Sequence, residues 1–315
     1  KVAAYRERVH HPERLTHPLQ RVGAKGSGEF RQISWDQALD EVAEAIERAR
    51  TAHGAETVWP YHFAGTMGLV QRDSIHRFRH AFGFSREHET ICVTTACNGW
   101  VAGHGKIWGA DPREIGESDL IVVWGGNPVS TQVNVMTHIA KARKTRGAKL
   151  VVIDPYRTPT AEAADIHIPI RPGTDGALAC AVMQVLFAEN LADWDYMREF
   201  SDGPERLQQH LTTRTPEWAE EITGIPAADI RDFARLYGKT ERAYLRVGYG
   251  FTRSRNGAAN LPAGGHGQME APGWRGAVFQ PRALRRRRHP DQRARRGRSE
   301  YTGARHVADR PRADG

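Results

Sequence analysis

Three short polar segments carry the residue types that bind a nucleotide. Residues 125–127 read Gly-Gly-Asn, residues 154–157 read Asp-Pro-Tyr-Arg, and residues 172–175 read Pro-Gly-Thr-Asp. Backbone amides and a guanidinium can bind phosphate oxygens, and a carboxylate can accept hydrogen bonds from ribose hydroxyls. Each segment alone could equally be a turn or a helix cap, and the GxGxxG pattern of a dinucleotide fold is absent. Three such segments in succession favour one shared ligand.

Cysteine chemistry is the second possibility. Cys92, Cys97 and Cys180 form neither a CxxC pair nor an even disulfide set, which is typical of a reducing compartment. Cys92 fits a buried small hydrophobe. Cys97 lies among polar residues in a segment, 93–100, that we expect to be a loop, where a thiolate could ligate a soft metal. The sequence shows no zinc-type spacing of His and Cys, no P-loop and no nucleophile elbow.

A βαβ unit is expected to position the polar segments. Apolar, β-branched runs at residues 120–124 and 150–153 are too short for helices and indicate buried parallel strands. Between them, residues 133–145 have helical spacing and end before Gly147, where a helix-terminating glycine is expected. The face shared by Val135, Ile139 and Ala142 is predicted to be buried. Ligands of open α/β sheets bind beyond the carboxyl ends of such strands, which is where the polar segments begin.

The rest of the chain predicts further α/β structure. Ser34 is expected to cap a helix that runs to about residue 52, with Gln37 reaching back to it and an apolar face that includes Leu39 and Val42. Residues 1–33, broken by proline and glycine, are expected to be irregular. Strands are predicted at 57–63 and 243–247, helices at 74–82, 176–190, 216–222 and 227–237, and a glycine-rich strand end at 248–257.

The net charge of +8 comes from the end of the chain. Residues 281–315 contain 12 Arg, no Lys and 4 acidic residues, so residues 1–280 are formally neutral. This tail has few apolar residues and is expected to be disordered; it could be a nucleic-acid-binding arm, although it lacks interleaved aromatic residues. No run of about 18 apolar residues and no signal peptide occur, so a membrane span is not expected.

Seven segments together resemble the molybdopterin oxidoreductase family, which includes dimethyl sulfoxide reductases, formate dehydrogenases and nitrate reductases. The resemblance runs from Lys1 to about Ala263. The segments are HPERLTHPLQRVG, ISWDQALDEVA, DPREIGESDLIVVWGGNPVSTQ, GAKLVVIDPYRTPTAEAAD, PGTDGALACAV, TPEWAEEITGIP and GYGFTRSRNG. The resemblance implies Rossmann-like α/β domains that bind a molybdenum bis(molybdopterin guanine dinucleotide) cofactor.

The resemblance also assigns roles to individual residues. The family's first dinucleotide loop matches Gly125, Gly126 and Asn127; its ribose and pyrophosphate contacts match Asp154, Pro155 and Arg157; its guanine site matches Gly173, Thr174 and Asp175; and its pterin-facing strand end matches Gly248, Gly250, Arg253 and Asn256. Lys1 resembles the family's lysine between an iron–sulfur cluster and the pterin. The cysteines that bind this 4Fe-4S cluster in full-length members are absent from these residues.

The metal ligand has two possible registers. Alignment of residues 101–103, Val-Ala-Gly, with the same tripeptide in formate dehydrogenases places the ligand position at Ala96, which has no ligating atom. Cys97, one residue later, stands where those enzymes have a catalytic histidine. Either Cys97 ligates after a shift of one residue, or the protein leaves this position of the metal to an oxygen or sulfur ligand. Cys97 is the expected catalytic and metal-binding residue, and the missing histidine disfavours formate as substrate.

The family pattern stops abruptly after Ala263. With suitable GC-rich codons, back-translation of residues 264–281 in a shifted frame gives VAMAKWKHRGGGALFSN, which resembles the family at this point. We therefore expect a reading-frame slip near Gly264 and a non-native tail over residues 264–315. The expected organisation is residues 1–33 as the remnant of an amino-terminal domain, and residues 34–263 as two interleaved α/β lobes, the second at about 105–240.

The resulting functional hypothesis is a fragment of a molybdenum oxidoreductase that performs two-electron redox or oxygen-atom transfer. Sulfoxides or N-oxides, nitrate and sulfur oxyanions are candidate substrates, and an electron-transfer subunit is a possible partner. The alternatives are a nicotinamide-dinucleotide-dependent dehydrogenase and an inactive pseudogene product. No specific nucleic-acid partner is expected. The cytoplasm is the expected compartment, with the periplasm left open because a targeting signal could precede Lys1.

Overall fold

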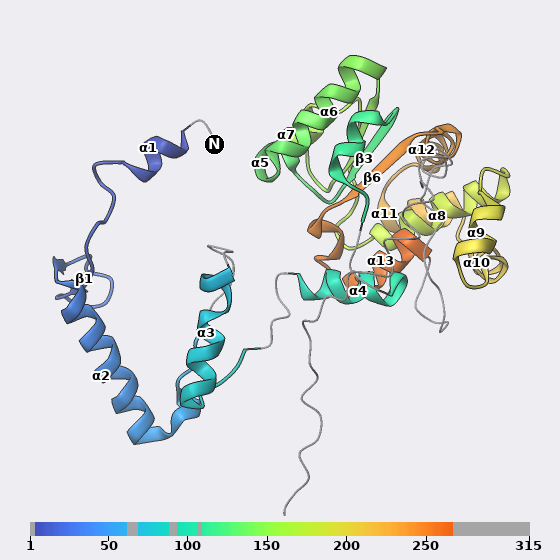
Figure 1. Ribbon diagram of the computed structural model, residues 1–315. Helices are drawn as coiled ribbons and strands as arrows, with labels where there is room; N and C mark the ends of the chain where they lie inside the picture. The colour runs from blue at the N-terminus through green and yellow to red at the C-terminus, as the bar shows by residue number, and fades with distance from the viewer. Residues whose placement is uncertain (1–3, 62–68, 88–92, 106–108, 267–315) are drawn as a thin grey trace, which may run out of the picture. The chain divides into compact units, whose positions relative to one another are not determined.

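The computed structural model describes residues 4–61, 69–87, 93–105 and 109–266, which form two compact units. Unit 1 extends to Thr90 and unit 2 begins at Ile91. The predicted α/β class with a parallel sheet is confirmed in unit 2 (Figure 1). The arginine-rich tail beyond residue 266 and Lys1 lie outside the described residues.

Unit 1 consists of a small hairpin and helices. Its elements are α1 (Tyr5–Val9), the antiparallel strands β1 (Leu19–Arg21) and β2 (Phe30–Gln32), α2 (Trp35–His53), the 3₁₀ helix η1 (Ala55–Thr57) and α3 (Leu69–Phe82). The prediction that residues 1–33 are irregular is therefore wrong for α1 and the hairpin. The strand predicted at 57–63 is also wrong in its described part, since Thr57 ends η1 and residues 58–61 are irregular.

One of the two hydrogen bonds predicted at the amino terminus of α2 is present. The Ser34 hydroxyl accepts a hydrogen bond from the Gln37 N–H at 3.1 Å. The Gln37 side chain does not reach back; its Nε2 donates to Glu41 Oε1 at 2.9 Å, one helical turn further on. The predicted apolar face is present on α2, but Leu39 and Val42 are exposed.

Unit 2 is built around a four-stranded parallel sheet. The strands are β3 (Leu120–Trp124), β4 (Lys149–Ile153), β5 (Ile166–Ile168) and β6 (Ala243–Val247), and their order across the sheet is β5-β4-β3-β6. The predictions for β3, β4 and β6 are confirmed. The chain order β3, β4, β5 moves outward in one direction, and β6 then pairs on the other side of β3, so β3 is central.

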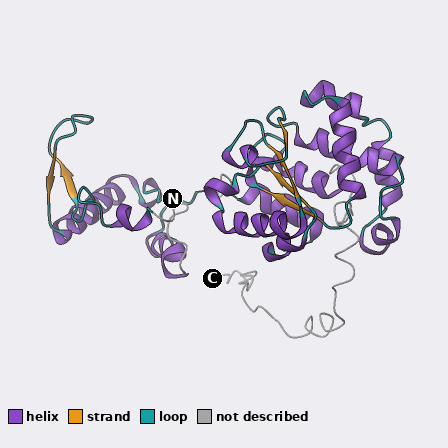
Figure 2. Cartoon of the chain, turned by 90° about the horizontal axis from the view of Figure 1, so that it is seen from above, coloured by secondary structure: helices purple, strands orange, loops and turns teal. Residues whose placement is uncertain are grey.

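Helices cover both faces of this sheet (Figures 1 and 2). Alternate residues of β3 face opposite ways: Val122 belongs to one apolar core and Ile121 to the other. The first core is shared with α8 (Asp175–Ala188), α11 (Pro216–Thr223) and α12 (Ala227–Lys239). The second is shared with η2 (Pro112–Glu117) and α6 (Val133–Arg146). The helix α6 buries the predicted face and ends at Gly147, which has the left-handed backbone of a C-cap.

Shorter elements complete unit 2. They are α4 (Thr94–His104), α5 (Pro128–Thr131), α7 (Pro159–Glu162), α9 (Trp194–Phe200), α10 (Pro204–Leu211), η3 (Tyr249–Thr252) and α13 (Gly257–His266). The helices α9 and α10 pack against α8 through a small satellite core that includes Met183, Met197 and Leu207. The helix α4 packs mainly against α13.

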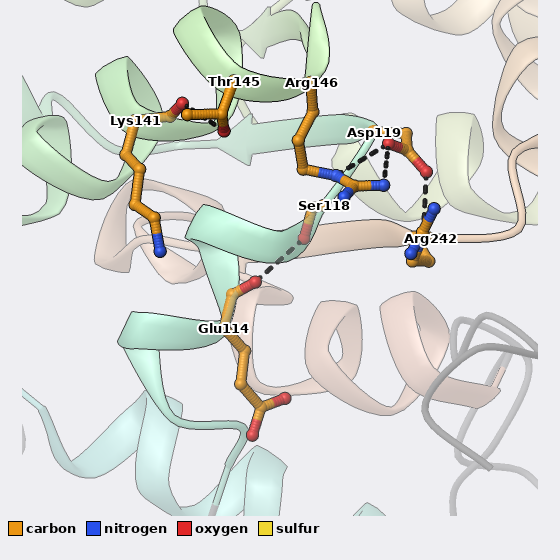
Figure 3. Close-up of polar contacts among 7 residues, drawn as sticks. All are labelled: Glu114, Ser118, Asp119, Lys141, Thr145, Arg146 and Arg242. Carbon is orange, nitrogen blue, oxygen red and sulfur yellow. Dashed lines mark hydrogen bonds and ion pairs between the residues drawn. The ribbon is translucent and has the colours of Figure 1, made fainter. Parts of the chain in front are cut away.

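Ion pairs tie α6 to the amino-terminal edge of the sheet. Asp119, directly before β3, accepts hydrogen bonds from Arg146 at 2.6 Å and from Arg242 at 2.9 Å (Figure 3). In the same region Lys141 pairs with Glu117 at 3.1 Å. Arg146 belongs to α6 and Arg242 directly precedes β6, so Asp119 joins three segments where β3 begins.

Candidate functional site

The carboxyl ends of all four strands form one edge of the sheet. Trp124, the last residue of β3, is in register with Ile153 of β4 and Val247 of β6, and Ile153 is in register with Ile168 of β5. The three polar segments identified in the sequence therefore leave neighbouring strands side by side, as predicted, and the segment after β6 joins them. We call this region the carboxyl edge.

The glycines after β3 and β6 allow two backbones to touch. The Gly250 N–H donates to the Gly125 carbonyl oxygen at 2.9 Å, and the Gly248 N–H donates to the Trp124 carbonyl oxygen at 2.7 Å. A Cβ on Gly125 would lie 2.4 Å from the Phe251 nitrogen, and one on Gly248 would lie 2.3 Å from the Gly125 oxygen. Gly125 also has a φ of +63°. Contact between the loops therefore explains these glycines.

Trp124 lies beneath the carboxyl edge and connects three of its loops. Its side chain is 1% exposed, and the indole Nε1–H donates a hydrogen bond to Asp175 Oδ1 at 2.8 Å. Its ring also meets Phe251, after β6, edge to face with centroids 5.0 Å apart. Asp175 at the start of α8 is thereby fixed to the central strand and to the loop that follows β6.

The two carboxylates of this edge are both buried. Asp175 is 7% exposed and Asp154 is 8% exposed. Desolvation raises the pKa of Asp175, partly offset by the Trp124 hydrogen bond, and the nearby Asp154 raises it further. Desolvation also raises the pKa of Asp154, against lowering by the Tyr156 N–H and by His167. Proximity of two desolvated carboxylates makes this edge receptive to hydrogen-bond donors and positive charge.

Asp154 has a turn role and an available acceptor. Its Oδ1 accepts from the Tyr156 N–H at 3.3 Å, the bond expected of a turn aspartate. Its Oδ2 has no hydrogen-bond partner among the described residues. The Arg157 guanidinium, three residues later, is exposed and likewise has no partner within the described part of the chain. Pro155 is exposed between them.

The segment before α8 is organised internally. The Thr174 hydroxyl donates to the Arg171 carbonyl oxygen at 2.7 Å and does not cap α8, so the simple capping interpretation does not hold for it. Gly173 has a φ of +80°, and a Cβ there would lie 3.3 Å from Ser254 Cβ. The loops before α8 and after β6 are therefore in close proximity.

The segment after η3 is polar and exposed. Asn256 Oδ1 accepts from the Ser254 hydroxyl at 3.0 Å, and the Arg253 guanidinium lies 6.0 Å from the centroid of the Tyr249 ring. Its base is held by Asn260 of α13, which is buried and whose Nδ2 donates to the Phe251 carbonyl oxygen at 2.8 Å.

Cys97 lies on a helix rather than a loop. Residues 94–104 form α4, so the prediction of a loop at 93–100 is wrong apart from its first residue. Ala96 is 8% exposed and packs into the first core, whereas Cys97 is half-buried. A Cβ on Gly99 would lie 2.3 Å from the Ala258 carbonyl oxygen. Close packing against α13 holds α4 in helical form despite its small and polar residues.

Two further features concern metal binding and membrane crossing within the described residues. They contain no cluster of three or more His, Cys, Asp or Glu side chains placed to hold a metal ion. None of the helices in these ranges has both the length and the apolar character that crossing a bilayer requires.

Comparison with known proteins identifies the family of this chain. A model of the molybdopterin oxidoreductase family matches residues 14–263, most of the chain. The chain belongs to the molybdopterin oxidoreductase family. Membership implies a cofactor made of molybdenum and pterin. Polar loops at the carboxyl edge are compatible with binding of such a cofactor.

Individual members of the molybdopterin oxidoreductase family are similar over most of this chain. "Probable oxidoreductase YoaE" of Bacillus subtilis is 40% identical over 258 residues, which cover 82% of this chain and 38% of that protein. "Dimethyl sulfoxide reductase DmsA" of Haemophilus influenzae is 34% identical over 291 residues, covering 80% and 35%. The solved structure of acetylene hydratase from Pelobacter acetylenicus matches with a TM-score of 0.63 at 26% identity, covering 82% and 36%.

The chain therefore spans a little over a third of the length of these relatives. Within that third, the loops that resemble the family's dinucleotide-binding segments lie together at the carboxyl edge of unit 2. Lys1, which resembles the family's lysine beside the iron–sulfur cluster, and Cys92 lie outside the described residues.

Sequence reasoning missed the residues that hold these family loops in place. Trp124, Thr160, Phe251 and Asn260 are buried beneath the loops and contact them. A buried tryptophan at a strand end signals that an acceptor is needed, because an indole N–H inside a protein is normally hydrogen-bonded. The identity of that acceptor could not be read from the sequence, since Asp175 is 51 residues away.

Proposed function

We propose that the carboxyl edge of unit 2 binds a guanine dinucleotide arm of a molybdenum bis(molybdopterin guanine dinucleotide) cofactor. The observation that carries the proposal is the convergence of four strand-end loops, three of which supply Asn127, Asp154 and Asp175. The full-length protein would then catalyse two-electron redox or oxygen-atom transfer on a small molecule. Similarity to a protein named dimethyl sulfoxide reductase supports sulfoxides as a candidate substrate class.

The residues present fit such a ligand chemically. Asp154 offers an acceptor oxygen for ribose hydroxyls, and the Arg157 guanidinium, which no described residue pairs with, is suited to a pyrophosphate. Asp175 retains an Oδ2 that can accept from a guanine edge while its Oδ1 is held by Trp124. The closely packed glycines hold these groups at fixed separations. When bound, the cofactor supplies the redox chemistry of molybdenum; the protein supplies binding and orientation.

Cys97 is our proposed protein ligand to the metal. Ala96, the other register, lacks a ligating atom and has its side chain in the apolar core. Cys97 follows it on α4 and is partly exposed. We further propose that a 4Fe-4S cluster and an electron-transfer partner belong to the full-length protein, and that the segment around Arg253 and Asn256 faces the pterin.

Binding of free nucleotides tests the proposal without the metal. Titration of the 315-residue chain with GDP, ADP and NADH, followed by calorimetry, should show GDP binding at least about tenfold more tightly than the others, because Asp175 reads the guanine edge. Asp175→Asn, which keeps an oxygen for Trp124, should remove most of that preference. Equal affinity for all three nucleotides would contradict the guanine assignment, and preference for NADH would support the dehydrogenase alternative.

We also propose that residues 264–315 are read from a slipped frame. The family match ends at residue 263, next to the expected slip, which supports this interpretation. Independent sequencing of the DNA around codon 264 tests it: a missing or extra base is expected, and an uninterrupted frame in every read would contradict it. If the frame is intact, the arginine-rich arm becomes native sequence, and the inactive-pseudogene alternative loses one of its supports.

A further inference from the structure

The hydroxyl of Thr160 joins the loop after β3 to helix α7. Thr160 is 0% exposed; its Oγ1 accepts a hydrogen bond from the Val129 N–H at 3.1 Å and donates one to Asn127 Oδ1 at 2.7 Å. Asn127 occupies the N-cap position of α5, yet its side chain does not cap that helix. An N-cap asparagine ordinarily accepts a hydrogen bond from the backbone N–H two or three residues later. Here the Val129 N–H donates to Thr160, which follows the next strand, instead of to Asn127.

These two bonds determine which way the Asn127 carboxamide is turned. A hydroxyl has one hydrogen, and with the Val129 N–H directed at Oγ1 that hydrogen is free to be donated to Asn127 Oδ1. If the carboxamide were turned over, the Thr160 hydroxyl would face the Asn127 NH₂ group instead of an acceptor oxygen, and this buried hydrogen bond would be lost. Asn127 therefore directs its oxygen inward and presents the two N–H groups of Nδ2.

Donors without acceptors thus lie on two neighbouring loops. Asn127 Nδ2 has no hydrogen-bond partner in the described part of the chain, and neither has Arg157, which precedes Thr160 by three residues. An amide donor and a guanidinium together suit an oxyanion. We propose that Thr160 is a positioning residue that sets Asn127 as a hydrogen-bond donor to a phosphate oxygen of the ligand. This inference rests on the nucleotide-binding role proposed above.

The test compares a ligand with phosphates and one without. GDP and guanosine are titrated against the 315-residue chain and its Thr160→Val variant, which keeps the side-chain volume and removes the hydroxyl. The expected result is a loss of about tenfold in GDP affinity, the effect of one hydrogen bond to a charged group, with guanosine affinity unchanged. Thr160→Ser, which restores the hydroxyl, should recover the GDP affinity.

A double substitution separates positioning from general damage. In an Asn127→Ala background, Thr160→Val should cost no further GDP affinity, because its effect passes through Asn127. Thr145→Val is the matched control: this hydroxyl donates to the Lys141 carbonyl oxygen within α6 at 2.9 Å, in the region of Figure 3, and GDP binding should not change.

Four outcomes would overturn the inference. Equal losses for GDP and guanosine would make Thr160 merely structural, and additive losses in the Asn127→Ala background would show that it does not act through Asn127. Unchanged GDP affinity in Thr160→Val would refute the positioning role while leaving the proposed function intact. Failure of the unsubstituted chain to bind GDP would instead refute the nucleotide-binding role and the inference together.

Discussion

At the amino edge of the parallel sheet Asp119 is bound by two arginines (Figure 3), whereas at the carboxyl edge Asp154 and Asp175 are buried and form no ion pair with Arg or Lys among the described residues. Arginine hydrogen bonds lower the pKa of Asp119 despite its desolvation, while desolvation dominates for the other two. At the carboxyl edge the Arg157 guanidinium has no partner among the described residues. The amino edge therefore pairs its carboxylate with arginines of the same chain, whereas the carboxyl edge keeps carboxylates and a guanidinium available to bind a ligand.

The largest expected effect comes from the close approach of the Gly125 and Phe251 backbones at the carboxyl edge. Gly125→Ala should lower the free energy of unfolding of unit 2 by about 3 kcal/mol, because a Cβ meets the Phe251 nitrogen and φ is positive. Gly147→Ala has a similar φ of +66° but open space around the added Cβ, so about 1 kcal/mol is expected. Urea unfolding measures both. Equal costs would mean that loop packing contributes little.

The second effect concerns the Trp124 bond to Asp175. Trp124→Phe removes the indole donor from a buried carboxylate and should destabilise the protein by about 2 kcal/mol. Arg242→Gln removes one of two cations from Asp119, which keeps Arg146 and remains partly exposed, so a loss of less than about 1 kcal/mol is expected. Chemical denaturation at neutral pH compares the two.

The loss of ring volume in Trp124→Phe needs its own control. Trp194→Phe makes the same change in the satellite core, at an indole N–H with no hydrogen bond among the described residues. It should cost less than Trp124→Phe. If the two tryptophan variants lose equal stability, the Asp175 bond adds nothing beyond packing.

The smallest effect is a pH dependence of opposite sign at the two edges. Folding lowers the pKa of Asp119 from its usual 3.8, so this residue stabilises the fold above that value and the contribution is lost as pH falls through the folded pKa. Folding raises the pKa of Asp175 from 3.8, so its contribution is present below that value and is lost as pH rises through the folded pKa.

Unfolding free energies from about pH 3 to about pH 8 test these signs. Relative to the unsubstituted chain, Asp119→Asn should be least stable at neutral pH and lose that disadvantage in acid. Asp175→Asn keeps an acceptor for Trp124 but cannot ionise. Its stability relative to the unsubstituted chain should therefore increase as pH rises and Asp175 of the unsubstituted chain ionises inside the protein. The same slope for both variants would contradict the contrast between the edges.

The sequence predicts the local elements of unit 2 well. Strands β3, β4 and β6, the buried face of α6 and the stop at Gly147 follow from apolar periodicity and a glycine at positive φ, which are short-range signals. Adjacency of the polar loops follows because consecutive parallel strands place their carboxyl ends together. These predictions needed no knowledge of distant contacts.

Long-range contacts explain the failures. A loop was expected at residues 93–100 because Cys97 lies among polar residues, yet packing against α13 gives the helix α4 instead. Gly125 and Gly248 also touch each other's loops, a contact between distant segments that the sequence does not reveal. The roles of Trp124 and Thr160 depend on partners 51 and 33 residues away, which spacing alone does not identify.

The pairing of β3 with β6 also bears on how the chain is made. The partner of Leu120 is Ala243, 123 positions later, so one side of the central strand stays open until β6 has been synthesised. Such a distant contact slows folding, because closing a long loop costs conformational entropy before the strand pairing contributes stabilising free energy. A nascent chain halted before Ala243 would expose an unpaired apolar strand edge, which is a template for aggregation. Chaperone protection during synthesis would matter most in the interval between β3 and β6.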